Sequence, residues 1–370
     1  MTSDITPIVM PKWGLAMQEG DLTTWLVEDG SQVEQGTEIA EIETTKIANV
    51  FEASITGTIH HVAQIGETLP VGALIAVMSA EGTNTDEIKA FITEFQSNFV
   101  PEETDSDTGP EPKRLSVGEI ELSYLDVGPD DGDAIFLIHG FGADSNGWLF
   151  NQTALSEHMR TISVDLPGHG KSSKRVGEGS IQGLAQIISQ MLDELNLQRV
   201  HLVGHSLGGG IALALAERAD VTSLSLIAPA GVGAEINGDF LNGFLTAKRR
   251  KALQPVLQLL VADPELIGRE MVEDVLKLKR LDGVPEALQT LIDANFQGNR
   301  QQHDLRPSLS LKPTLVLWGE KDAIIPSSQA LQMPEECTVK LIPDAGHIPQ
   351  MEASNDINDA ILDHVKATNQ

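Results

Sequence analysis

The sequence contains a single cysteine, Cys337, among its 370 residues, so an intramolecular disulfide framework is excluded. It also lacks a long apolar run, since none reaches the ~18 residues that a membrane-spanning helix needs. Its first residues, Met1–Pro7, contain neither the basic nor the apolar segment of a signal peptide. We therefore expect a cytoplasmic protein that does not bind membranes.

Basic residues are scarce as well: 25 Lys and Arg stand against 54 Asp and Glu, which gives a formal net charge of −29. A negative field of this size opposes nonspecific binding to nucleic acids and to anionic membrane surfaces. The acidic excess per residue is largest in the first 112 residues. Two interpretations of this acidic excess remain open: it keeps the protein soluble, or it steers the protein toward basic surfaces of partner proteins.

The first 80 residues contain an internal repeat. Gly30–Gly36 aligns with Gly66–Gly72 at an offset of 36 positions, and each copy reads as short strands between glycine turns. Two copies of one β unit predict a small flattened β-barrel over residues 1–80. Between the copies, residues 41–52 have the alternating ends of a hairpin, and Lys46 lies near its predicted tip.

Residues 81–113 have a different character. Their apolar positions predict one amphipathic helix over Asp86–Val100. The next stretch, Pro101–Pro112, is acidic and rich in Pro, Ser and Thr, and it offers no apolar anchor. Such a segment cannot bury enough surface to order itself, so the sequence predicts a flexible acidic linker.

From residue 114 onward, short apolar runs alternate with helical patterns. The runs suit buried parallel strands, and they cover residues 134–138, 200–203, 224–227 and 314–318. The alternation predicts a mostly parallel sheet with helices on both faces over residues 114–370. Residues 234–306 interrupt the alternation with a mainly helical pattern, which indicates an inserted cap.

A serine with the surroundings of a nucleophile lies in Gly204–Gly208, which fits Gly-x-Ser-x-Gly. A predicted strand leads into this motif and a helix of small residues leads out of it, and such a turn lifts a serine hydroxyl above a sheet. We expect Ser206 to be the nucleophile, with the Leu207 backbone N–H as one oxyanion donor. The second donor is expected to be the Phe141 N–H, in the glycine-rich turn after the strand that ends at Ile138.

The acid and the base are expected farther along the chain. Asp322 and His347 each follow a predicted strand. The order Ser206, Asp322, His347 resembles that of the α/β-hydrolase superfamily, and the resemblance extends over residues 114–370. It implies that His347 takes the serine proton and that Asp322 orients the imidazole.

A lysine on a turn is by itself most often a solvated charge. Lys46, however, lies midway between the two repeats, and the flanks Met10–Gly14, Met17–Gly20 and Glu43–Ile47 make residues 4–80 resemble the lipoyl domains of 2-oxoacid dehydrogenase complexes. The resemblance implies that lipoate is attached to Lys46 through an amide. Biotinyl domains share the fold but usually have methionine on both sides of the lysine, so the absence of these methionines favours lipoate.

A lipoyl domain followed by an acyltransferase domain is the arrangement of the acyltransferase components of 2-oxoacid dehydrogenase complexes. The usual His-x-x-x-Asp-Gly motif of their catalytic domain is missing here, and residues 81–113 do not match their subunit-binding domain. The fusion to an α/β-hydrolase domain instead resembles the dihydrolipoyllysine-residue acetyltransferases of bacterial acetoin dehydrogenase systems.

This resemblance implies an acyltransferase that moves acetyl from S-acetyldihydrolipoyl-Lys46 to CoA. The implied cofactors are lipoate on Lys46 and CoA as a cosubstrate. The implied partners are a thiamine-diphosphate-dependent acetoin dehydrogenase component, a dihydrolipoyl dehydrogenase, and a lipoate ligase or lipoyltransferase. No metal site and no nucleic-acid partner are expected.

Two other functions remain open from the sequence. The chain could be an ester or thioester hydrolase that its lipoyl domain tethers to a dehydrogenase complex, or a lipoyl carrier with an idle hydrolase domain. His139 and His205 are interpreted as packing or hydrogen-bonding residues. The densest basic run could bind the phosphates of CoA or could be a solvated helix face; it consists of Lys248, Arg249, Arg250 and Lys251.

Overall fold

The computed structural model describes residues 5–11, 19–43, 48–80, 82–99, 111–130 and 132–369, with the backbone alone at residues 48, 49 and 270. The chain divides into two compact units, residues 1–109 and 110–370.

Two four-stranded antiparallel sheets contain the strands described in the first unit. One sheet has the order β1 (Ile5–Val9), β8 (Leu74–Ser79), β6 (Gly57–His61), β3 (Gln32–Val33), and the other has the order β5 (Ala48–Glu52), β4 (Glu38–Glu43), β2 (Glu19–Trp25), β7 (Thr68–Pro70). Fully buried side chains from both sheets form one core, among them Leu22, Ile39, Ile42, Ile59 and Ile75. The predicted flattened β-barrel is therefore confirmed.

The internal repeat has a structural counterpart. β3 and β7 are the corresponding strands of the two copies, and each belongs to a different sheet. The glycines that bracket them have the same left-handed backbone, with φ of 79° and 84° at Gly30 and Gly36 and of 89° and 81° at Gly66 and Gly72. Glycine adopts this conformation at little cost, so the repeated glycines allow the same turns in both copies.

A helix follows the last strand of the barrel and packs against it. The helix predicted over residues 86–100 is α1 (Thr85–Asn98), and the Asn84 side chain caps it by accepting a hydrogen bond from the Asp86 backbone N–H at 2.9 Å. Ile88 of α1 is 5% exposed, in one cluster with Ile5, Leu74 and Val77 of β1 and β8. The apolar stripe of α1 therefore covers one sheet, and the helix is an integral part of the first unit.

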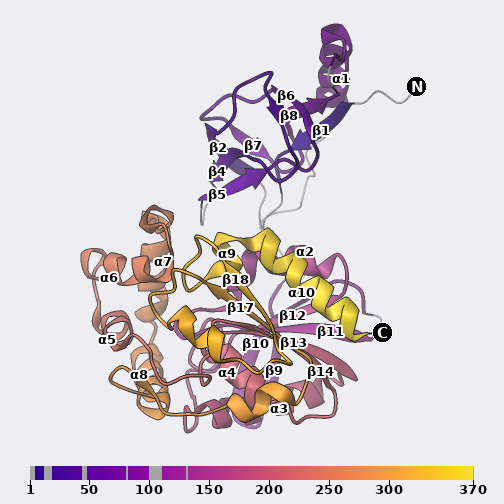
Figure 1. The fold of residues 1–370 in the computed structure, drawn as a ribbon. Coiled ribbons are helices and arrows are strands. Elements are labelled where there is room, and N and C mark those ends of the chain that lie inside the picture. The colour runs from indigo at the N-terminus through magenta and orange to yellow at the C-terminus, as the bar shows by residue number, and fades with distance from the viewer. Residues whose placement is uncertain are drawn as a thin grey trace. The chain divides into compact units, whose positions relative to one another are not determined.

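An eight-stranded sheet forms the centre of the second unit (Figure 1). Its order is β18 (Thr338–Ile342), β17 (Thr314–Gly319), β14 (Val221–Ile227), β13 (Arg199–His205), β11 (Asp133–Ile138), β12 (Arg160–Val164), β10 (Ile120–Val127), β9 (Lys113–Val117). The pairings from β18 to β12 are parallel, and β10 pairs antiparallel with both of its neighbours. The prediction of a mostly parallel sheet is confirmed.

Helices cover both faces of this sheet, because alternate residues of its strands point to opposite faces. Phe136 and Leu202 belong to one core, with α3 and α4, whereas Leu137 and Val203 belong to a second core, with α2 and α10. The helices and short turns outside the inserted region are η1 (Ser145–Trp148), α2 (Leu149–Ser156), α3 (Ile181–Glu194), α4 (Leu207–Ala214), η5 (Ser327–Gln332), α9 (Pro349–Glu352) and α10 (Ser354–Thr368).

The region between β14 and β17 is mainly helical, as the sequence predicts. Its elements are α5 (Gly238–Thr246), α6 (Arg250–Leu257), η2 (Gln258–Leu260), η3 (Pro264–Leu266), α7 (Arg269–Lys279), α8 (Val284–Asn295), β15 (Phe296–Gln297), β16 (Arg300–Gln301) and η4 (Arg306–Ser310). β14 and β17 pair directly, with Leu224 opposite Thr314. The inserted region therefore leaves the sheet and returns to it at neighbouring strands.

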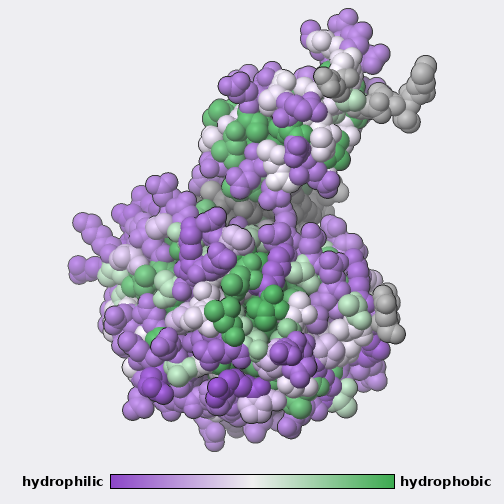
Figure 2. Space-filling view, in the orientation of Figure 1, coloured by the Kyte–Doolittle hydropathy of each residue, from purple (hydrophilic) through white to green (hydrophobic). Residues whose placement is uncertain are grey.

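Hydrophilic side chains cover most of the face of the second unit that Figure 2 shows, and a smaller group of apolar side chains lies near its centre. Single exposed apolar side chains, such as Leu331 at 77% exposure, are ordinary on protein surfaces. None of the helices within the described ranges is both long and apolar enough to span a membrane.

Candidate active site

Ser206 lies at the sharp turn between β13 and α4. Its backbone has φ 52° and ψ −115°, and a residue other than glycine seldom has a positive φ. The turn fits because its neighbours lack side chains: a Cβ at Gly204 would lie 2.4 Å from the Gly208 carbonyl oxygen, and one at Gly208 would lie 2.1 Å from the Ile138 carbonyl oxygen. The fold thus holds a strained serine in place, in the geometry of a nucleophile elbow.

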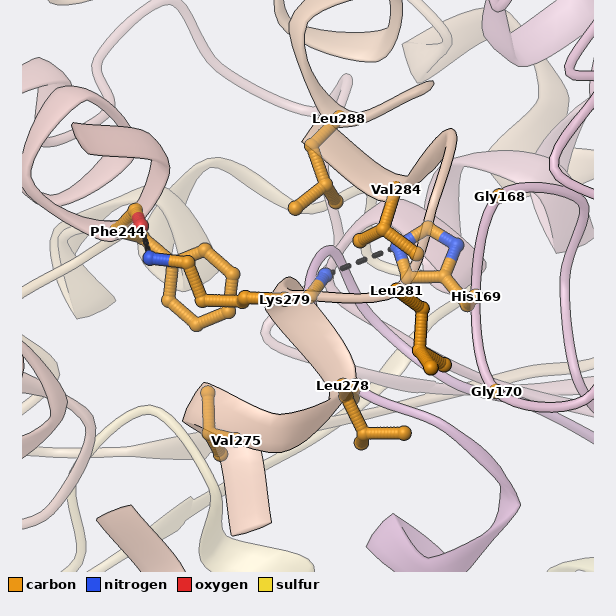
Figure 3. Close-up of a pocket in the computed structure, with 12 residues that line it drawn as sticks. Gly168, His169, Gly170, Phe244, Val275, Leu278, Lys279, Leu281, Val284 and Leu288 are labelled. Carbon is orange, nitrogen blue, oxygen red and sulfur yellow. Dashed lines mark hydrogen bonds between the residues drawn. The ribbon is translucent and has the colours of Figure 1, made fainter. Parts of the chain in front are cut away.

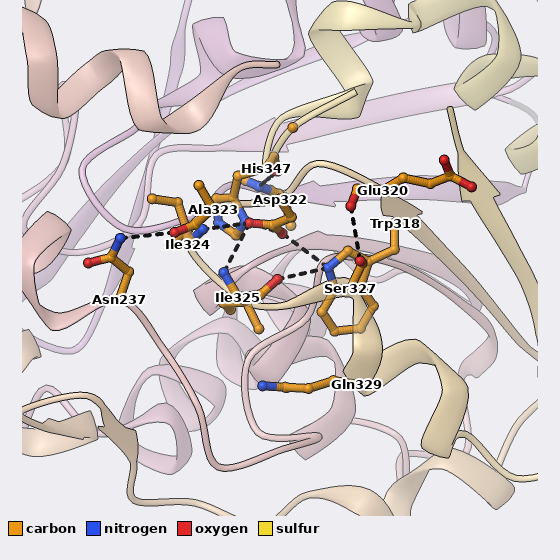
Figure 4. Close-up of polar contacts among 12 residues, drawn as sticks. Asn237, Trp318, Glu320, Asp322, Ala323, Ile324, Ile325, Ser327, Gln329 and His347 are labelled. Carbon is orange, nitrogen blue, oxygen red and sulfur yellow. Dashed lines mark hydrogen bonds and ion pairs between the residues drawn. The ribbon is translucent and has the colours of Figure 1, made fainter. Parts of the chain in front are cut away.

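Asp322 and His347 lie in the loops that follow β17 and β18, and Figure 4 shows the polar contacts around them. His347 Nδ1 and Asp322 Oδ2 are 2.8 Å apart, and the two side chains are 3% and 0% exposed. The carboxylate also accepts hydrogen bonds from the backbone N–H groups of Ile324 and Ile325, at 2.8 and 3.0 Å, and from Trp318 Nε1, at 3.0 Å. Since an ionised carboxylate only accepts hydrogen bonds, Nδ1 of the neutral imidazole carries the proton, and Nε2 keeps the lone pair that can take one from a hydroxyl.

The residue before the serine connects the elbow to the histidine loop. His205 Nε2 donates a hydrogen bond of 2.8 Å to the His347 carbonyl oxygen, and the two rings have centroids 4.8 Å apart. On the other side of the elbow, a Cβ at Gly140 would lie 3.1 Å from Ser206 Cβ. The structure therefore brings together the elbow, the Asp322–His347 pair and the turn after β11.

Two backbone N–H groups flank the serine and have no acceptor among the described parts of the chain, namely those of Phe141 and Leu207. Leu207 is the first residue of α4, and the first amides of a helix have no partner within it. By contrast, the next amide after Phe141, that of Gly142, donates to His169 Nε2 at 3.0 Å. Both N–H groups remain available to an oxyanion.

Two buried histidines hold the turn that carries Phe141. His139 Nδ1 donates to the Gly140 carbonyl oxygen at 2.8 Å, and its Nε2 accepts from the Leu166 N–H at 2.9 Å. Burial lowers the pKa of both His139 and His169 below the ordinary value, so both are neutral hydrogen-bonding groups. Because the carbonyl and N–H of a trans peptide point in opposite directions, fixing the Gly140 carbonyl also fixes the direction of the Phe141 N–H.

A small, mostly apolar pocket that is partly open to solvent lies between this turn and the inserted region (Figure 3). Lys279 provides its one amino group: Nζ donates to the carbonyl oxygens of Phe244 and of Ala247, the latter at 2.7 Å, and lies 4.8 Å from the Phe244 ring centroid. Burial lowers the pKa of Lys279 to about 8. The pocket is lined by Gly142, Ala143, Gly168, His169, Gly170, Phe244, Val275, Leu278, Lys279, Leu281, Val284 and Leu288.

Sequence reasoning did not single out Lys279, because a lysine at the end of an amphipathic helix has the pattern of a solvated charge. Lys279 is partly buried because the end of α7 lies near the end of α5. No local sequence pattern predicts that contact. His169 belongs to the turn over residues 165–172, which follows β12.

The predicted CoA-phosphate residues lie apart from the triad in the sequence and are not among the residues that line the pocket. They occupy the connection from α5 to α6 and the start of α6, and all four are exposed; they are Lys248, Arg249, Arg250 and Lys251. Lys46 lies outside the described residues, in the stretch 44–47 between β4 and β5, whose ends Glu43 and Ala48 pair with each other.

Two family models match this chain, one in each of its two units. The family model described as alpha/beta hydrolase fold matches residues 133–354, and the one described as Biotin-requiring enzyme matches residues 6–78. A solved meta-cleavage product hydrolase from Pseudomonas fluorescens is 22% identical, with a TM-score of 0.62 over 69% of this chain and 97% of that one. At that identity the likeness shows the fold alone.

Two relatives extend over nearly the whole chain. One from Pseudomonas putida is 46% identical over 97% of this chain and 98% of its own, and one from Cupriavidus necator is 40% identical over 98% and 97%. Both are named dihydrolipoyllysine-residue acetyltransferase component of acetoin cleaving system. Since this identity extends over both units, the chain belongs to the family of dihydrolipoyllysine-residue acetyltransferases, the acyltransferase components of acetoin cleaving systems.

Proposed function

We propose that the chain transfers an acetyl group from a dihydrolipoyl thioester to CoA, and that Ser206, Asp322 and His347 are its catalytic triad. One observation carries this assignment: His347 Nδ1 lies 2.8 Å from Asp322 Oδ2, and the same histidine is hydrogen-bonded through its carbonyl to His205, the residue before Ser206. Acid, base and nucleophile elbow thus form one hydrogen-bonded unit.

The transfer has two half-reactions in this scheme. Ser206 Oγ attacks the thioester carbonyl carbon while His347 Nε2 takes the hydroxyl proton. The C–S bond then breaks, and the proton passes from His347 to the leaving sulfur, which leaves an acetyl-serine. In the second half-reaction the CoA thiol gives its proton to His347 and attacks the acetyl-serine. The C–O bond breaks, and the proton returns to Ser206 Oγ, so no redox reagent is consumed.

The backbone N–H groups of Phe141 and Leu207 form the proposed oxyanion hole. Both are free of acceptors within the described residues, and both belong to turns that the glycines around them hold close to Ser206. Preorganised donors of this kind stabilise the charge that develops on the carbonyl oxygen, and loss of one such donor typically costs about 10²–10³-fold in rate.

Lipoate in amide linkage to Lys46 would supply the thiol that carries the acetyl group. The pairing of Glu43 with Ala48 leaves a short connection, residues 44–47, between two antiparallel strands. A lysine in such a connection fits the attachment site, since a modifying enzyme must reach it. The lipoyl–lysine arm on a mobile domain can then visit several active sites, at a concentration that the linker sets.

The chain is a component of an enzyme system, so it acts together with partner enzymes. We propose that these are a thiamine-diphosphate-dependent acetoin dehydrogenase component, a dihydrolipoyl dehydrogenase, and a lipoate ligase or lipoyltransferase that loads Lys46. We further propose a lipoyl domain at residues 1–80, a helix and acidic linker at 81–113, and an α/β-hydrolase domain at 114–370 with its cap at about 234–306. In this division α1, although it packs on the barrel, leads into the linker.

The function is tested with free acetyl-dihydrolipoamide, with and without CoA, by measuring acetyl-CoA and acetate. The wild-type chain should form acetyl-CoA and little acetate. Ser206→Ala should lower acetyl-CoA formation by roughly 10³-fold or more, as in triad enzymes. Lys46→Arg should leave transfer from the free substrate intact and stop only turnover of the assembled system, because it removes the attachment site but not the triad.

Two outcomes would overturn the proposal. Free acetate as the main product in the presence of CoA would make the chain a tethered thioester hydrolase. Near-normal acetyl-CoA formation by Ser206→Ala would show that the α/β-hydrolase unit is not the acetyltransferase.

A further inference from the structure

The peptide backbone that carries His347 is held by the inserted region as well as by the elbow. The Leu260 carbonyl oxygen, at the end of η2, accepts hydrogen bonds from the N–H groups of His347, at 2.8 Å, and of Ile348, at 3.2 Å. On the other side, the His347 carbonyl accepts from His205. The position of the proposed base therefore depends on where the segment around Leu260 lies.

One carboxylate joins that segment to the histidine loop. Glu352, the last residue of α9, accepts through Oε2 from the Gly346 N–H at 2.7 Å and through Oε1 from the Ala262 N–H at 2.6 Å. Gly346 immediately precedes His347, and Ala262 is two residues after Leu260. Each carboxylate oxygen thus holds one side of the contact. An amide in its place would offer a nitrogen to one of these N–H groups, where no hydrogen bond can form.

The two backbones approach so closely that no side chain fits between them. A Cβ at Gly346 would lie 2.7 Å from the Leu260 carbonyl oxygen and 2.9 Å from the Ala262 nitrogen. Any substitution there must push the inserted segment away from the histidine loop. The same contact therefore requires both a carboxylate at Glu352 and a glycine at Gly346.

We propose that Glu352 is a positioning residue: it clamps the inserted segment Leu260–Ala262 onto the loop of His347 and so sets the direction of the His347 imidazole. The proposal rests on the proposed role of His347 as the base. Its energetic basis is that a displacement of about 1 Å in a catalytic group can cost about 10²-fold in rate. A further consequence is that the inserted region and the base move as one body.

The test compares two variants that break the clamp with two matched controls. Glu352→Gln removes one acceptor, and Gly346→Ala forces the segment away. The controls are Asp356→Asn, a carboxylate on α10 that is 64% exposed, and Gly268→Ala in the inserted region, where an added Cβ has nothing within 4 Å. Steady-state transfer from acetyl-dihydrolipoamide to CoA gives kcat and both KM values for the full-length chain.

We expect both clamp variants to lower kcat by about 10- to 100-fold while the KM values for both substrates change less than twofold, and the controls to match the wild type. Combining the two substitutions should cost little more than either alone, because both break the same contact. The low-field proton resonance of His347 Nδ1–H, bonded to Asp322, should shift or broaden in both clamp variants and not in the controls.

The result distinguishes the failure of this proposal from the failure of the proposed function. Normal kcat in both clamp variants, with activity lost in Ser206→Ala, would leave the triad intact and refute the positioning role. A rise in KM at unchanged kcat, or costs that multiply in the double variant, would also refute it. Activity retained by Ser206→Ala would instead remove the triad itself.

Discussion

Three buried histidines support the site as uncharged hydrogen-bonding groups. Burial lowers the pKa of His139, His169 and His205 below the ordinary value. Each ring is held in one tautomer by backbone partners, as when His169 Nε2 accepts from the Gly142 N–H while Nδ1 donates to the Pro167 carbonyl at 3.1 Å. In His139 and His169, protonation of Nε2 would place a donor against the Leu166 or Gly142 N–H, so these two contacts require the neutral form. The Nδ1 partner of His347 is a side chain instead, the carboxylate of Asp322.

Buried neutral histidines also make stability depend on pH, and His201 is the residue to test. Burial lowers its pKa to about 4, whereas an unfolded histidine titrates near 6.5. Between these values the unfolded chain binds more protons than the folded one, so stability falls as the pH drops from about 6.5 to 4. We expect His201→Asn to weaken this pH dependence. The stability that the chain loses between pH 6.5 and 4 should become smaller by no more than about 3 kcal/mol.

Thermal unfolding of the second unit, followed between pH 4 and 7, measures the effect. His158→Asn, at an exposed histidine, is the control and should leave the slope unchanged. An unaltered slope in His201→Asn would show that this histidine is not held neutral by the fold.

At the level of elements, the sequence predicts the strands and the candidate site residues that directly follow them. Asp322 could be found because it follows a continuously buried strand, and Ser206 because glycines and a strand surround it. The clamp around His347 could not be found, since Leu260 contributes a backbone carbonyl and Glu352 looks like any acidic residue near a helix end. Contacts between backbones far apart in the chain have no pattern in the sequence.

One hypothesis from the sequence concerns the connection from α5 to α6 and the start of α6. It is that the basic run of residues 248–251 binds the phosphates of CoA. Its basic side chains are exposed, so an incoming phosphate could pair with them through charge-assisted hydrogen bonds. If they bind CoA, Arg249→Gln with Arg250→Gln should raise the KM for CoA by about tenfold, which corresponds to about 1.4 kcal/mol. The KM for acetyl-dihydrolipoamide should not change.

Lys366→Gln, at an exposed lysine on α10, controls for the loss of positive charge. If the CoA dependence of the double variant stays normal, the basic run is a solvated helix face.

In the whole molecule, two compact units are joined by a segment whose sequence is acidic and rich in Pro, Ser and Thr. The chain divides between residues 109 and 110, within the stretch Pro101–Pro112 that the sequence predicts as a linker. Because that stretch has no apolar anchor, proteases should reach it first. A protease that cleaves after Glu should cut at Glu102, Glu103 or Glu111 and release two stable fragments, as mass spectrometry of a time course would show.

The same digestion tests the proposed boundaries. Early cuts after Glu residues inside the barrel or the eight-stranded sheet would contradict them. Early cuts after Glu87 or Glu94 would show that α1 is released from the first unit more readily than its packing indicates.

The inserted region leaves the sheet at β14 and returns at β17, two strands that pair directly. Such an insertion is a module in the sense of protein engineering, since a different cap could be grafted between these strands without altering the register of the sheet. The clamp sets the condition for a successful graft. A foreign cap would have to present one backbone carbonyl and one N–H in the places of Leu260 and Ala262. A cap that lacks them would fold onto the sheet but leave the base without its support.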